Sequence, residues 1–243
     1  MVACFMLRSN FLNGVCTVAA VVPLMGQIPS VPKSIAGIAI PDSAMAKEAA
    51  SVAAAEPPAI FNHSLRTFLF AELVARAQRI DHDVEAVYVA SILHDTGLVP
   101  AFMSETERFE VDGANLSRKL LARFGVLGPR ADLVWDAVCL HDQGDIAKWK
   151  QPEVMLVSAG VGADFGAHAS ILNRADIASV LAAAPRAGFI PVFLDTVAAF
   201  VKRKPDATGN SWVTDVGYRM VPHFHVDNFV DEVKDDPFAG IAP

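Results

Sequence analysis

The sequence predicts an all-α fold organised as one domain. From Ser43 onward, apolar residues recur at helical spacing in one segment after another, and no segment shows the alternation of a half-buried strand. A chain of 243 residues, 53% hydrophobic and 19% charged, is long and apolar enough for one compact domain with a large core. No internal repeat divides it. We therefore expect a single helical domain.

Prolines and glycines delimit the first three expected helices. An Ala-rich helix is predicted over Ser43–Ala55, and the two prolines that follow it favour an extended connection. The next helix is predicted over Ser64–Arg79, where the apolar residues have 3.6-residue spacing. A third covers Val84–His94, and Gly97 is expected to supply its left-handed stop.

Three further helices are expected in the second half of the chain. Asp112 can cap a helix that ends at Gly125, and Pro129 suits the first turn of the next one. The apolar face of that helix continues into His141, which should therefore point toward the core. The segment Val154–Ala167 is apolar all round, which is typical of a central helix with neighbours on every side.

The two ends of the chain are expected to lie outside this domain, which we predict to span residues 35–212. Residues 1–34 form a predicted extension that is poorly ordered or signal-like, because the apolar run Gly14–Met25 has the size of a signal-peptide core. That run contains Pro23 and is too short to span a membrane. We expect a cytoplasmic protein, with secretion as the alternative, and a C-terminal tail over residues 213–243 that packs on or extends from the domain.

The charge distribution indicates a small-molecule substrate rather than a nucleic acid. The net charge is −7, and basic residues gather only at 202–204, so the phosphate-neutralising surface of a nucleic-acid-binding protein is missing. The helix expected over Val192–Lys204 has one apolar face, which packs either on its own core or on a second copy in a homo-oligomer. Cys4, Cys16 and Cys139 lack metal-binding or disulfide spacing, so any metal must use nitrogen and oxygen ligands.

A metal site between the core helices is the main functional prediction. Asp164 lies in the apolar central helix, where a buried carboxylate needs a cationic partner or a metal. No Lys or Arg is required by the sequence pattern to be buried beside it. His63 begins one predicted helix, His94 and Asp95 end another, and His141 lies on a third. Two imidazoles and two carboxylates form a mixed site suited to zinc, iron, manganese or nickel, with open positions for water.

Other polar residues near these positions leave alternatives open. His141 could be a core histidine, a fifth ligand or a donor to the substrate. Asp176 competes with Asp164 as the last carboxylate, although a loop or helix cap explains it more simply. His168 could support a carboxylate ligand, but we favour no role for it, and the histidines of 223–225 are expected to be solvated.

These residues together resemble the HD-domain superfamily of metal-dependent hydrolases. Its pattern is a lone His, then a His-Asp pair, then a later Asp, and within it the chain is most similar to cyanamide hydratase and its HD-domain relatives. The likeness extends from about residue 35 to about residue 212. The segments that carry it are Ile40–Ser43, Phe61–Arg66, Leu93–Gly97, Arg108–Ala114, Leu140–Asp142, the helix of Asp164, and Pro185–Phe189.

The resemblance implies a set of site residues. Its metal ligands would be His63, His94, Asp95 and Asp164, and its catalytic pocket residues would be Asn62, Arg66, Glu110 and His141. The chain departs from the cyanamide enzymes at two places. Thr96 follows the His-Asp pair where Ile is usual, and the acidic Asp142 follows the pocket histidine, where it could change substrate polarity or face solvent.

The function that the resemblance implies is metal-dependent addition of water to a small substrate. One divalent transition metal would lower the pKa of a bound water and polarise the substrate, with zinc as first choice and iron, manganese or nickel as alternatives. With a nitrile-type carbon the product is a urea or amide, and His141 or Glu110 would move the proton. The alternatives are hydrolysis of a phosphate ester held by Arg66, for which few basic residues are present, and a non-catalytic metal-binding domain.

Overall fold

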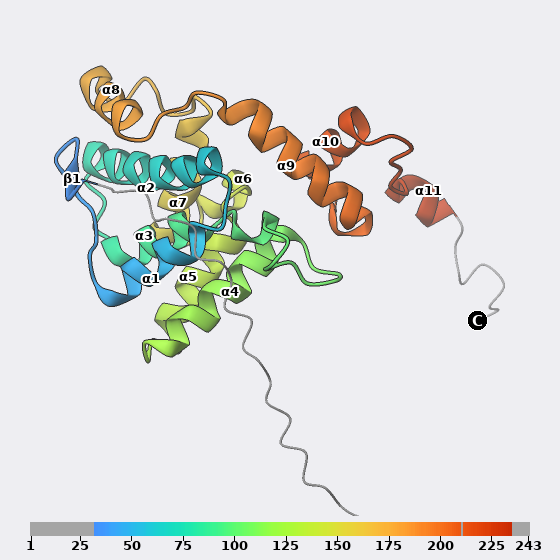
Figure 1. The fold of residues 1–243 in the computed structure, drawn as a ribbon, viewed down its shortest axis with the longest axis horizontal. Helices are drawn as coiled ribbons and strands as arrows, with labels where there is room; N and C mark the ends of the chain where they lie inside the picture. The colour runs from blue at the N-terminus through green and yellow to red at the C-terminus, as the bar shows by residue number, and fades with distance from the viewer. Residues whose placement is uncertain (1–31, 210, 235–243) are drawn as a thin grey trace, which may run out of the picture.

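The computed structural model describes residues 32–209 and 211–234, and it confirms the all-α prediction (Figure 1). A small antiparallel hairpin precedes the helices, with β1 at Ser34–Ile35 paired to β2 at Ile38–Ala39. The signal-like run Gly14–Met25 lies outside the described residues, and the predicted boundaries of the domain at 35 and 212 stay a prediction. In the described part of the chain, no helix is both long and apolar enough to span a bilayer.

The helices form a bundle whose last members pack along one side. The first part of the bundle consists of α1 (Ala44–Ala53), α2 (Pro58–Gln78), α3 (Val84–Leu93), the 3₁₀ turn η1 (Thr96–Leu98), α4 (Phe109–Arg123), α5 (Pro129–Cys139), α6 (Gly144–Ala147) and α7 (Pro152–Asp164). The remainder consists of α8 (Arg174–Ala183), α9 (Phe189–Arg203), η2 (Pro205–Ala207), α10 (Trp212–Met220) and α11 (Phe229–Lys234). In Figure 1, α9 runs along one side of the bundle, and α10 and α11 follow at the end opposite α8.

The centre of the bundle is the contact between α2 and α7, as predicted for an apolar central helix. The two backbones come very close at Gly160, where an added Cβ would lie 2.2 Å from the carbonyl oxygen of Thr67. Helix α7 also packs on α3, α5 and α6. This close crossing brings the residues of α2 to the C-terminal end of α7.

Helix α2 begins at Pro58, whereas the sequence predicts a start at Ser64. The two prolines belong to the start of this helix, with Pro57 as its N-cap and Pro58 as its first residue. At the first position the fixed φ of proline suits a helix, and no backbone N–H is needed. His63 therefore lies inside α2 rather than at its start. This register turns the His63 side chain into the bundle, where it is 1% exposed.

Two predicted helix boundaries near the site are wrong. Gly97 does not provide a left-handed stop but lies inside η1, and it is required because a Cβ there would lie 1.9 Å from the carbonyl oxygen of Phe109. Helix α4 starts at Phe109 rather than at a cap by Asp112. The carboxylate of Asp112 instead accepts hydrogen bonds from Lys204 Nζ at 2.8 Å and from the backbone N–H of Ser104 at 3.0 Å. The predicted end at Gly125 is confirmed by its φ of 73°.

A second apolar cluster joins α9 and α10 to the start of α4. Phe193, Val197, Phe200 and Val201, which form the apolar face of α9, are buried against residues such as Phe109 and Val213. The apolar face of α9 therefore packs on its own core. Because α9 crosses close to α2 and η1, its N-terminal end forms one wall beside His63.

Candidate metal centre

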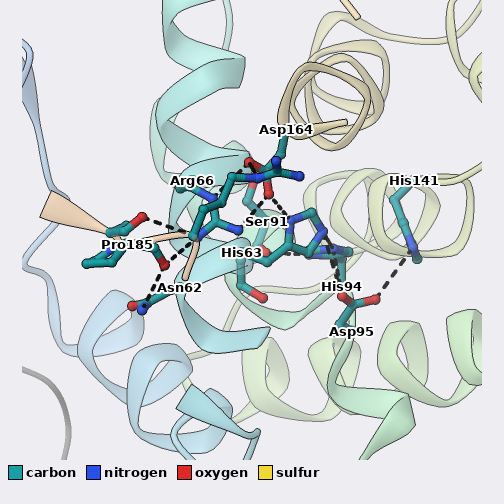
Figure 2. Close-up of polar contacts among 12 residues, drawn as sticks. Asn62, His63, Arg66, Ser91, His94, Asp95, His141, Asp164 and Pro185 are labelled. Atoms are coloured by element: carbon teal, nitrogen blue, oxygen red, sulfur yellow. Dashed lines mark hydrogen bonds and ion pairs between the residues drawn. The ribbon is translucent and has the colours of Figure 1, made fainter. Parts of the chain in front are cut away.

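Three of the predicted ligands gather at one point in the bundle core. His63 comes from the second turn of α2, His94 caps the C-terminal end of α3, and Asp95 lies between α3 and η1. One ligand atom from each residue can be chosen so that all three lie within 4.8 Å of one another, and all three side chains are buried. Figure 2 shows His63 and His94 next to each other beside the Asp95 carboxylate, and their rings meet edge-on at an interplanar angle of 70°.

Hydrogen bonds fix which nitrogen of each imidazole is free. His94 Nδ1 lies 2.7 Å from the carbonyl oxygen of Ser91, and His63 Nδ1 lies 2.7 Å from Asp164 Oδ2. Carbonyl and carboxylate oxygens only accept hydrogen bonds, so both Nδ1 atoms carry the proton. In the neutral imidazole each Nε2 atom therefore presents a lone pair, and the two Nε2 atoms are 3.3 Å apart. Two facing lone pairs repel unless a cation lies between them.

The distances among the three residues fit a divalent cation. Asp95 Oδ2 lies 3.3 Å from His94 Nε2 and 3.8 Å from His63 Nε2. Ligand atoms at about 2.0–2.1 Å around a tetrahedral zinc would be about 3.3 Å apart, so these spacings resemble the edges of a coordination polyhedron. Within the described part of the chain, Asp95 Oδ2 is buried and has no hydrogen-bond partner. An ionised oxygen without a partner is a further sign that the site is built for a cation.

The electrostatics of the cluster act in opposite directions on its two histidines. Burial would raise the pKa of Asp95, but the neighbouring His94, together with His63 and His141, outweighs it and holds that pKa well below its usual range. Burial lowers the pKa of His63, which favours the neutral imidazole that binds metals. Burial also acts to lower the pKa of His94, but the neighbouring Asp95 carboxylate raises it overall. The centre thus combines an ionised carboxylate with imidazoles whose Nε2 atoms face inward.

The fourth predicted ligand, Asp164, contacts the opposite side of the His63 ring. Besides His63 Nδ1, its carboxylate accepts hydrogen bonds from Arg66 Nε at 2.8 Å, Arg66 Nη2 at 2.7 Å and Arg186 Nε at 3.1 Å. These bonds hold the pKa of Asp164 well below its usual range against the effect of burial. In Figure 2 His63 separates this network from His94 and Asp95. The direct coordination of a metal by Asp164 stays a prediction.

The buried cation that Asp164 needs is present, contrary to the sequence argument. Arg66 is fully buried on the helical face of α2 that also carries His63, and its Nη1 donates to the carbonyl oxygens of Ala184 at 3.2 Å and Pro185 at 3.1 Å. The sequence contains a signal for this burial, because His63 and Arg66 are three residues apart and residues at this spacing lie on the same side of a helix. The role of Arg66 as a catalytic pocket residue stays a prediction.

His141 joins the cluster from the segment after α5, as its predicted inward orientation requires. It is 3% exposed, its Nδ1 lies 2.7 Å from the carbonyl oxygen of Val138, and its Nε2 is 3.9 Å from Asp95 Oδ1. Its ring centroid is 4.6 Å from that of His94. Burial, together with the charge of His94, lowers the pKa of His141, which favours the neutral imidazole.

Two other predicted pocket residues are placed away from the cluster. Asn62 is half-buried and donates a hydrogen bond to the carbonyl oxygen of Pro185 at 3.4 Å, beside Arg66. Glu110 is buried in α4 and forms an ion pair with Arg108. Burial raises the pKa of Glu110 to about 7, with Arg108 opposing and Asp142 reinforcing the shift. The roles of Asn62 and Glu110 in catalysis stay predictions.

The rival residues lie outside the centre. Asp176 is in the first turn of α8, whose cap is Asn173, as the simpler interpretation expected. Helix α7 ends at Asp164, so His168 does not continue its face and is exposed in the following turn. His223 and His225 are exposed, as predicted.

A cavity of about 400 Å³ opens onto the cluster and reveals residues that sequence reasoning missed. Its polar wall is made by His63, His94, Asp95, His141 and Asp142. Its apolar wall is made by Val161, Phe165, Ile190, Phe193, Leu194 and Trp212. The periodicity of α9 indicated that Phe193 is buried, but nothing in the local pattern indicated that it faces a histidine of α2.

Comparison with known protein families agrees with this geometry. Residues 60–180 match the HD domain family. The matched segment is just under half of the chain and contains the residues of the cluster as well as His141 and Asp164. The match supports the HD-domain superfamily, whose members are generally metal-dependent hydrolases. No curated protein matches the sequence.

Proposed function

We propose that this chain is a metal-dependent hydratase that adds water to a neutral carbon–nitrogen triple bond, with cyanamide as the simplest substrate. The observation that carries the proposal is the cavity at the His63, His94 and Asp95 cluster. It reaches a cation-binding centre at one end, and none of the described residues that line it is Lys or Arg. Such a site suits a small neutral electrophile better than an anion.

His63, His94 and Asp95 are the proposed metal-holding residues. When bound there, a divalent metal supplies a water of lowered pKa and a Lewis acid that polarises the substrate. The Nδ1 hydrogen bonds of both histidines keep their Nε2 atoms turned toward Asp95. Asp164 is proposed to orient His63, because a carboxylate bonded to the far nitrogen of a metal-binding histidine fixes its tautomer and raises its basicity.

His141 is the proposed general base. Its Nε2 faces the Asp95 carboxylate, and the side chain lies in the cavity wall. With Nδ1 at the carbonyl oxygen of Val138, the neutral ring has its lone pair on Nε2 and can accept a proton from the attacking water there. The water oxygen bonds to the carbon, one π bond of the triple bond breaks, and the proton is delivered to the substrate nitrogen. Tautomerisation of that adduct gives the urea or amide. Glu110 is less suited to this step, because its carboxyl group forms an ion pair with Arg108.

The engagement of the arginines disfavours a phosphate ester. All the described hydrogen bonds of the Arg66 guanidinium go to Asp164 and to two backbone carbonyls, so this side chain has little capacity left for a phosphate. Arg186 is also bonded to Asp164. Phosphate recognition normally needs converging cations or a helix N-terminus rich in free N–H groups.

The first experiment is metal analysis of the purified protein and of its His94→Ala variant, followed by assays with cyanamide and an aryl phosphate. We expect about one transition metal per chain that is lost in His94→Ala, and urea formation that is abolished in Asp95→Ala with helicity retained. His225→Ala, which removes an exposed histidine, should keep both properties. Metal without turnover of either substrate would favour a non-catalytic binding domain. Absence of metal even after reconstitution would overturn the assignment of the centre.

A further inference from the structure

The cavity is larger and more apolar than a three-atom substrate requires. Its volume is about 400 Å³, whereas a water molecule has a share of only about 30 Å³ in the liquid. Pockets of several hundred Å³ with mainly apolar walls are typical of sites for larger organic molecules. Cyanamide, with three non-hydrogen atoms, would leave most of the apolar wall without a contact.

Aromatic rings form the wall of the cavity that adjoins the cluster, since the ring centroids of Phe165 and Phe193 lie 5.6 and 6.1 Å from that of His63. Phe193 and Trp212 stack with their centroids 5.5 Å apart and their planes 21° from parallel. Phe165, with its centroid 5.7 Å from that of Phe193, continues the same wall. Phe165 and Ile190, which line the cavity, are 49% and 44% exposed. A bound apolar group could cover this surface and remove it from water.

Asp142 gives this wall a fixed orientation. Its Oδ2 accepts a hydrogen bond from Trp212 Nε1 at 2.9 Å, and its Oδ1 accepts one from Gln143 Nε2 at 3.0 Å. The indole is thereby tied to the residue next to His141. The acidic residue that departs from the cyanamide-hydratase pattern therefore holds Trp212 in place.

From these contacts we propose that the substrate carries a planar apolar group, such as a phenyl ring, on its carbon–nitrogen triple bond, and that Trp212 and Phe193 determine this specificity. The inference rests on the proposed hydration chemistry, because it assumes that the reacting end lies at His63, His94 and Asp95. The planar group would contact the Phe193 and Trp212 wall, where ring stacking adds to the gain from apolar burial. The reaction is balanced by water alone, which adds across the triple bond as for cyanamide.

The test compares two substrates that share one reacting group, cyanamide and N-phenylcyanamide, on the metal-loaded protein. We expect kcat/KM to be at least tenfold higher for N-phenylcyanamide. Trp212→Ala should lower that preference at least fivefold, mainly through KM, and Trp212→Phe should restore part of it because a ring is retained. Trp149→Ala is the matched control, since Trp149 is 81% exposed and is not a lining residue; it should leave the preference unchanged.

Calorimetric binding of the two products, urea and phenylurea, separates the inference from the proposed function. Tighter binding of phenylurea that is weakened in Trp212→Ala, without turnover of either cyanamide, would support the aromatic specificity and overturn the hydration chemistry. Turnover of cyanamide with no preference for the phenyl compound, and equal binding of the two products, would overturn the aromatic specificity and leave hydration standing. If Trp212→Ala does not fold, Phe193→Leu replaces it in both measurements, with the same expected loss of preference.

Discussion

The His63 ring lies between two carboxylates that act on its two different nitrogens. Nδ1 is 2.7 Å from Asp164 Oδ2, whereas Nε2 is 3.8 Å from Asp95 Oδ2. The first contact comes from the end of α7 and is reinforced by Arg66, which lies one turn along α2 from His63. With Nδ1 occupied by Asp164, Nε2 is the ring nitrogen left to face Asp95 and His94.

Replacement of Asp164 by Asn should therefore weaken metal binding without abolishing it. Loss of the carboxylate bonded to a metal-binding histidine typically costs about 10–100-fold in metal affinity, whereas Asp95→Asn would remove a proposed ligand and should cost more. Competition with a chelator would measure both affinities. Asp176→Asn is the control, because Asp176 is a carboxylate of the neighbouring α8 that lies outside the centre.

The same two variants can also contradict the orienting role of Asp164. Equal loss of metal in Asp164→Asn and Asp95→Asn, with circular dichroism unchanged in both, would make Asp164 a direct ligand as the family resemblance implies. The orienting role would then be wrong.

Replacement of Gly160 by Ala should destabilise the fold. A Cβ at this position would lie 2.2 Å from the carbonyl oxygen of Thr67 and 3.1 Å from the backbone nitrogen of Ala71, so α2 and α7 would have to separate. Overpacking of this kind costs about 1–3 kcal/mol. Urea denaturation would measure it, with Gly144→Ala as control, since the nearest atom to a Cβ there is Ser158 Oγ at 3.5 Å. Equal stability of the two variants would contradict the close crossing.

Replacement of Lys204 by Met should destabilise the protein more than the same change at Lys202. Lys204 is buried, and its Nζ donates to Asp112 Oδ2 at 2.8 Å, whereas Lys202 is exposed. Removing one partner of a buried ion pair costs about 3–5 kcal/mol, because the other charge is left buried without compensation. Chemical denaturation of both variants checks the difference. A Lys204→Met protein as stable as Lys202→Met would show that Asp112 is hydrated in the folded state.

The buried carboxyl of Glu110 should make stability fall as pH rises. Burial raises its pKa from the usual 4.5 to about 7 in the folded state, so folding favours the protonated form. This contribution is fully present below about pH 4.5 and is lost as pH rises through about 7. At about 1.4 kcal/mol per pKa unit, the change between pH 5 and 8 is roughly 2–3 kcal/mol.

Glu110→Gln tests this pH dependence because it cannot ionise. The unfolding free energy of the variant should decline less between pH 5 and 8 than that of the unchanged protein. Glu107→Gln, an exposed glutamate of the preceding loop, should show the original decline. A decline that is identical in Glu110→Gln and in the unchanged protein would mean that the ion pair with Arg108 keeps Glu110 ionised throughout.

Local patterns were sufficient to predict most of the helices and the cluster of histidines. The 3.6-residue spacing of apolar residues indicates a helix wherever it occurs, and it also indicates the buried face, so the inward direction of His141 was predictable. His94 and Asp95 are neighbours in the chain, and a polar pair that follows a buried, largely apolar helix must either be exposed or meet a partner inside. Helix boundaries that depend on tertiary contacts were not predictable. The place of Gly97 inside η1 and the start of α4 at Phe109 both depend on the close approach of η1 to the backbone of Phe109.

By itself, the sequence determined the all-α architecture, the order of the helices and the presence of a nitrogen–oxygen site built on His63, His94 and Asp95. Only the tertiary structure decided that Asp164 pairs with Arg66 and that Trp212 is bound to Asp142 beside the cavity. Those partners are 98 and 70 residues apart, and no local periodicity relates them. The reason is physical: periodicity shows which side chains leave water, whereas the crossing of α2 with α7 and the packing of α9 and α10 determine which of them meet.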